Sequence, residues 1–139
     1  MGAWCITRLS LTFDSEPIIA YFLGEGTAKK IVPLLQGILN GETVAYVNIM
    51  NLSEIYYILH PINPKIVDSK IELLQNYGIN IVPVTDNGLW KTAAKIKSSH
   101  SLSLADAFAV ATAMETNSTL VIGRDKEFNT VDIEKIALL

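Results

Sequence analysis

Residues 8–17 read Arg-Leu-Ser-Leu-Thr-Phe-Asp-Ser-Glu-Pro, and this stretch passes from a strand pattern directly into a helix start. Polar and apolar residues alternate from Arg8 to Phe13, as they do in a half-buried strand. Ser15 is a suitable helix cap, and Pro17 fits the first turn of a helix. The stretch therefore predicts a strand followed at once by a helix, with Asp14 at the junction.

The same change from a short apolar run to a longer helical pattern recurs along the chain. Strands that alternate with helices favour a mainly parallel sheet with helices on both faces. We therefore expect an α/β protein, a three-layer α/β/α fold with four to five strands, in which residues 1–139 form a single domain. Further strands are expected at 43–47, 79–84, 119–122 and 135–139, and helices at 15–24, 27–39, 48–59, 64–77, 86–97 and 103–115.

Composition limits the functional class. Half of the residues are hydrophobic and 18% are charged, which is typical of an ordered globular protein. The apolar runs are short and interrupted, so we expect no membrane span. There is no signal-peptide pattern, and the single cysteine, Cys5, excludes an internal disulfide, so we expect a cytoplasmic protein. The net charge of −3 argues against tight non-specific binding to nucleic acid, but it is compatible with a nuclease whose metal supplies positive charge.

Four acidic residues, Asp14, Glu54, Asp106 and Asp125, lie at or near the boundaries of apolar segments. Asp14 closes the first expected strand and Asp125 follows the fourth, so both belong to the edge of the sheet where such folds bind ligands. Glu54 and Asp106 lie on helices that could face the same edge. Clustered carboxylates repel one another unless they share a cation, and oxygen ligands suit Mg²⁺ or Mn²⁺. We therefore expect one metal site.

Each acid also has a simple structural explanation. Asp14 could cap the following helix, and Glu54 could lie on a solvated helix face. Asp106 stands three residues after Ser103, which is a variant of the capping box. Asp125 could be a turn residue. These explanations stay open for each residue taken alone.

Four stretches that carry these acids, taken together in this order, resemble the PIN domain family, particularly the VapC-type toxin ribonucleases. The resemblance covers nearly the whole chain from Leu9 onward. It implies that Asp14, Glu54, Asp106 and Asp125 hold Mg²⁺ or Mn²⁺, and that a metal-activated water hydrolyses RNA phosphodiester bonds. It also implies a protein antitoxin and a homodimer. The stretches are Phe13-Asp14-Ser15, Asn51-Leu52-Ser53-Glu54-Ile55, residues 103–107 and residues 121–128.

Four neighbours of the acids could serve the same site: Ser15, Asn51, Arg124 and Lys126. Ser15 keeps a hydroxyl beside Asp14, and Asn51 stands one turn before Glu54. Arg124 and Lys126 flank Asp125 and could contact phosphate, although turn charges in solvent are an equally simple explanation.

The chain departs from the family pattern at Gly123, where Thr or Ser is common, and in the polar residues Ser10 and Thr12 of the first strand. The missing hydroxyl at Gly123 favours a second hypothesis, a catalytically weak or inactive PIN-like module that acts through RNA or protein binding. A third hypothesis is a phospho-acceptor receiver domain. The residues after Asp14 do not supply the acidic pair that such a domain needs.

Overall fold

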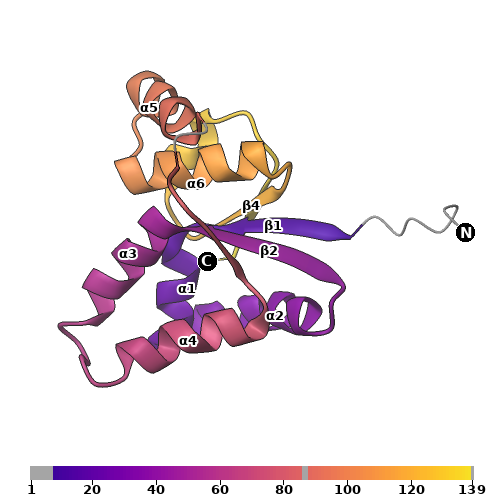
Figure 1. Ribbon diagram of the computed structural model, residues 1–139, viewed down its shortest axis with the longest axis vertical. Helices are drawn as coiled ribbons and strands as arrows, with labels where there is room; N and C mark the ends of the chain where they lie inside the picture. Colours follow the sequence, from indigo (N-terminus) through magenta and orange to yellow (C-terminus); the bar gives the residue numbers. More distant parts are fainter. Residues whose placement is uncertain (1–7, 86–87, 139) are drawn as a thin grey trace, which may run out of the picture.

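The computed structural model describes residues 8–85 and 88–138. Within these ranges the chain forms one five-stranded sheet in the order β3-β2-β1-β4-β5, and every pairing is parallel (Figure 1). This confirms the predicted α/β class. The strands are β1 Leu9–Phe13, β2 Thr43–Asn48, β3 Asn80–Val82, β4 Thr119–Ile122 and β5 Lys135–Ala137.

Helices cover both faces of the sheet, as the alternating pattern predicted. Figure 1 shows α5 (Leu89–Ser99) and α6 (Leu104–Glu115) on one side, with α1 (Ser15–Phe22), α2 (Ile31–Leu39) and α4 (Val67–Tyr77) on the other. The remaining helices are α3 Ile49–Leu59 and the 3₁₀ turns η2 Gly26–Lys30 and η3 Lys126–Thr130. None of the described helices is long and apolar enough to cross a membrane.

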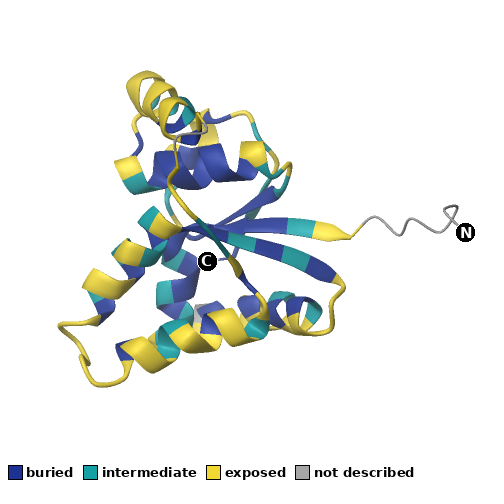
Figure 2. Ribbon diagram, viewed as in Figure 1, coloured by how far each residue is buried: buried dark blue, intermediate teal, exposed yellow. Residues whose placement is uncertain are grey.

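Figure 2 shows that each helix and strand buries one part of its surface, and most of the buried residues are apolar. Leu11 and Phe13 of β1 belong to a core cluster that also includes Ile18 of α1 and Val47 of β2. Helix α6 is buried almost all round, which fits its run of apolar residues after Asp106.

Thr12, a polar residue of β1, forms hydrogen bonds with two other hydroxyl side chains. Its side chain is fully buried, and its Oγ1 lies 2.5 Å from Ser118 Oγ and 3.3 Å from Thr116 Oγ1. A buried hydroxyl is tolerated when it is hydrogen-bonded. This cluster, at the turn between α6 and β4, accounts for Thr12 in the strand.

Several boundaries differ from the predictions for local reasons. Asp14 takes the N-cap position of α1, and Ser15, predicted as the cap, is the first helical residue. The helix predicted at 27–39 divides into η2 and α2, because Pro33 has no backbone N–H and fits only the first turn of a helix. β3 ends before Pro83 for the same chemical reason. Cys5 and the predicted cap Asp86 lie outside the described residues.

Candidate metal centre

The four predicted acids line a single open cleft with a volume of about 450 Å³. Asp14 follows β1, Asp125 follows β4, Glu54 lies on α3 and Asp106 lies in the first turn of α6. The parallel sheet explains this convergence, since the carboxyl ends of its strands share one edge. Two further acids that the sequence reasoning missed, Glu16 and Glu127, line the same cleft.

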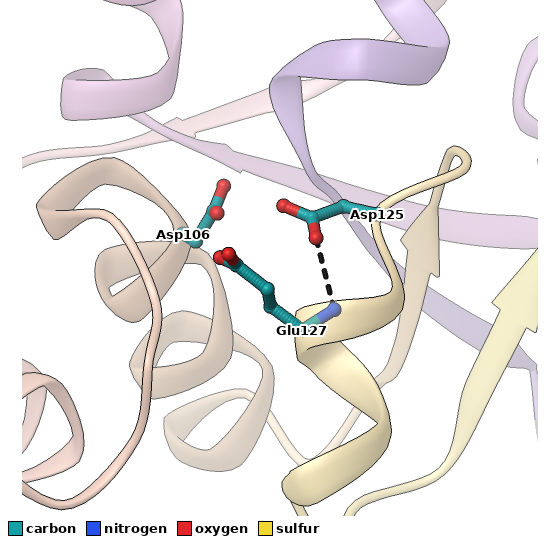
Figure 3. A group of neighbouring side chains, drawn as sticks. All are labelled: Asp106, Asp125 and Glu127. Carbon is teal, nitrogen blue, oxygen red and sulfur yellow. Dashed lines mark hydrogen bonds between the residues drawn. The ribbon is translucent and has the colours of Figure 1, made fainter.

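Three of the carboxylates approach closely. Figure 3 shows Asp106, Asp125 and Glu127 facing one another, with one carboxylate oxygen from each lying within 4.8 Å of the others. Asp125 caps η3, where its Oδ1 accepts a hydrogen bond from Glu127 N at 2.9 Å. The turn explanation for Asp125 is therefore correct, and the same turn directs Glu127 toward Asp106. In the sequence, Glu127 lies two residues after Asp125, but this spacing alone does not show that its side chain faces the same site. The 3₁₀ turn η3 brings it there.

Helix capping places Asp106. Ser103 Oγ accepts a hydrogen bond from Asp106 N at 3.1 Å, so the predicted cap is present. Burial raises the pKa of the Asp106 carboxyl, and the negative charges of Asp125 and Glu54 act in the same direction. Hydrogen bonds from Ser103 and Asp14 oppose this rise.

Asp14 is the most deeply buried acid of the cleft. Burial raises the pKa of its carboxyl well above the ordinary 3.8, and the charge of Asp106 raises it further. A hydrogen bond to Asp106 raises the pKa of Asp14 while it lowers that of Asp106. Burial and the neighbouring charge thus both favour the neutral form of the Asp14 carboxyl.

Asn51 connects the three helices that carry acids. Its buried Nδ2 lies 3.1 Å from both Ser15 Oγ and Ala105 O, and 3.5 Å from Asp14 Oδ1. Ser15 Oγ in turn donates to Asn51 O at 3.3 Å. Asn51 Oδ1 has no hydrogen-bond partner among the described residues. Both residues thus lie behind the acids, where they orient α1 and α6.

Comparison with known proteins decides the family. The model of the PIN domain matches residues 11–134. The chain belongs to the PIN domain family. No curated protein matches it by sequence.

Solved structures share the PIN fold of this chain. VapBC2 from Rickettsia felis bound to a promoter DNA fragment is 12% identical, with a TM-score of 0.69, and the match covers 93% of this chain and 98% of that chain. A toxin-antitoxin complex from Klebsiella pneumoniae is 17% identical, with a TM-score of 0.66 and coverage of 88% and 92%. VapC20 from Mycobacterium tuberculosis, a sarcin-ricin loop cleaving toxin, is 15% identical, with a TM-score of 0.64 and coverage of 79% and 86%. At these identities the similarity concerns the fold.

The two cations that flank Asp125 do not line the acidic cleft. Arg124 Nη2 contacts Glu25 Oε2 at 3.5 Å, in a pair that is exposed to solvent. Neither Arg124 nor Lys126 is among the described residues that line the cleft. Their predicted contact with phosphate stays a prediction.

The chemistry of the cleft in this PIN domain fits a hard divalent cation. Its lining contains carboxylates from helices α1, α3 and α6, from η3 and from two strand ends, and no Lys or Arg from the described ranges. Mg²⁺ and Mn²⁺ prefer such oxygen ligands. The buried, unpartnered oxygen of Asn51 behind Asp14 adds a further acceptor near the cluster.

Proposed function

We propose that this PIN domain is a metal-dependent endoribonuclease that hydrolyses RNA phosphodiester bonds. The observation that carries the proposal is the convergence of Asp14, Glu54, Asp106, Asp125 and Glu127 on one open cleft. Family membership and the likeness to a sarcin-ricin loop cleaving toxin support RNA as the substrate.

Asp106, Asp125 and Glu127 are the residues best placed to hold Mg²⁺ or Mn²⁺, because their oxygens already lie together. Asp14 would complete the set from the buried side, and Glu54 would add a carboxylate from α3. A bound metal supplies positive charge for the phosphate and lowers the pKa of a coordinated water. The carboxylates orient that metal, while Asn51 and Ser15 hold α1 and α6 in place.

The proposal includes a protein partner. A toxin-antitoxin complex and VapBC2 are among the structural neighbours, which supports a toxin with a protein antitoxin. An apolar groove of about 220 Å³ between α1 and the α3–α4 connection would suit such a partner, since Leu23, Ile62 and Ile66 leave large apolar surfaces exposed. A homodimer and action in the cytoplasm are further parts of this proposal.

RNA cleavage tests the proposal directly. A structured RNA is incubated with Mn²⁺, with Mg²⁺ or with a chelator, using wild type, Asp14→Asn, Asp106→Asn and the control Asp68→Asn on α4. Wild type and Asp68→Asn should cleave only with metal, and the two cleft variants should lose activity on the order of 100-fold. Equal cleavage by all four proteins, or cleavage by wild type in chelator, would contradict the proposal.

Growth separates a toxin from a housekeeping nuclease. Expression of the wild-type protein without a partner should arrest cells, because RNA cleavage is then unrestrained. Expression of Asp106→Asn at the same level should not. Normal growth with wild type that is active on RNA in vitro would exclude the toxin role while leaving the nuclease assignment intact.

A further inference from the structure

Glu16 connects the two strand ends that carry the acids. It lies in the first turn of α1, immediately after β1, and its Oε2 accepts a hydrogen bond from the backbone N–H of Arg124 at 3.0 Å. Arg124 directly precedes Asp125 after β4. The bond therefore attaches the turn that carries Asp125 and Glu127 to the first helix.

Gly123 leaves the space that this bond needs. A Cβ at position 123 would lie 2.4 Å from Glu16 Cδ and 2.5 Å from Glu16 Oε2, far inside van der Waals contact. Gly123 is not among the glycines with positive φ, so an alanine could adopt its backbone conformation. Glycine at this position leaves room for the Glu16 carboxylate where it now lies, and backbone freedom is not the reason for it.

We propose that Glu16 is a positioning residue, which holds the 123–127 turn so that Asp125 and Glu127 face Asp106. The inference rests on the proposed metal site. One carboxylate oxygen of Glu16 accepts a hydrogen bond from the backbone N–H of Arg124, so the side chain has a structural role beside the acidic cluster. Because residue 123 has no side chain, the Glu16 carboxylate can lie here. The missing hydroxyl at this position therefore does not indicate a lost activity.

The contact predicts that two different substitutions have one effect. Glu16→Ala removes the acceptor, and Gly123→Ala displaces the same carboxylate, so each should lower the metal-free Tm by about 3–5 °C. Each should also weaken Mn²⁺ binding, measured by calorimetry, by about 10-fold. The double variant should lose no more than either single variant, because only one contact exists to be lost. Gly26→Ala, at an open position without positive φ, is the matched control and should leave both values unchanged.

Glu16→Gln separates positioning from metal ligation. The amide oxygen of Gln can still accept the Arg124 N–H, so Tm and Mn²⁺ affinity should stay near wild type. Mn²⁺ affinity as low as that of Glu16→Ala would show a ligand and overturn the positioning role. Additive losses in the double variant, or a Gly123→Ala variant equal to Gly26→Ala, would also overturn it. If wild type binds no Mn²⁺, the metal site fails, and the metal-free Tm values of the same proteins still decide the Glu16 contact.

Discussion

Asp14 and Asp106 line the same cleft, and burial together with the charge of Asp106 raises the pKa of the Asp14 carboxyl well above its ordinary value. Two carboxylates at such a site cannot both ionise at low cost without a cation. A divalent metal bound between them would offset this repulsion and favour the ionised form of both carboxylates.

Asp14→Asn should raise the metal-free Tm by a few degrees at neutral pH, as measured by thermal unfolding in chelator. Asn keeps an Oδ1 acceptor for Asn51, and it carries no charge that burial would penalise. Asp132→Asn, at an exposed position after η3, is the control and should change Tm little. A marked loss of stability in Asp14→Asn would show that the ionised carboxylate has a favourable partner within the fold.

The stability of the metal-free protein should fall as pH rises through the folded-state pKa of Asp14. Burial and Asp106 raise this pKa above the ordinary 3.8, so between the two values the folded protein binds more protons than the unfolded chain. Unfolding then becomes easier as pH increases. Tm measured from mildly acidic to neutral pH in chelator tests this sign. Asp14→Asn should flatten the profile, and an identical slope in both proteins would contradict the assignment.

Asn51→Ala should destabilise the protein by about 1–3 kcal/mol, because it leaves Ala105 O and Ser15 Oγ without their buried donor. Urea unfolding in chelator measures this change without any contribution from metal. Asn76→Ala, on the exposed face of α4, is the matched control. If the two variants unfold alike, Asn51 does not connect the helices in the way described.

Glu127→Gln should weaken Mn²⁺ binding by about 10-fold in calorimetry, because it removes one of the three clustered carboxylates. The metal-free Tm should not fall, since the substitution relieves repulsion near Asp106. Glu72→Gln on α4 serves as the control. Unchanged affinity in Glu127→Gln would restrict the metal site to the four acids that the sequence indicated.

The sequence was informative where a pattern has one structural consequence. Alternation from Arg8 to Phe13 and the β-branched run of residues 43–47 predicted strands. The helices between the strands predicted a parallel sheet, and strand ends in such a sheet meet at one edge. The positions of Asp14 and Asp125 in one cleft follow from that rule. Ser103 was identified correctly as a cap, because capping is local.

Residues whose role depends on tertiary geometry were missed. Glu16 resembles an ordinary acid in a first helical turn, which the helix dipole favours anyway. Glu127 faces Asp106 only because η3 turns it there. The sequence showed that Gly123 lacks a hydroxyl, but it could not show that Glu16 fills the space. No local pattern contains a contact between residues 16 and 123.

The effect of Mn²⁺ on thermal unfolding tests the central claim, that the acids form one metal site. Binding to the folded state alone stabilises it by RT ln(1 + [Mn²⁺]/Kd), so the Tm of wild type should rise steadily with Mn²⁺ concentration. The Tm of Asp106→Asn should rise far less over the same range. A wild-type Tm that Mn²⁺ does not change, or an equal rise in both proteins, would contradict the account.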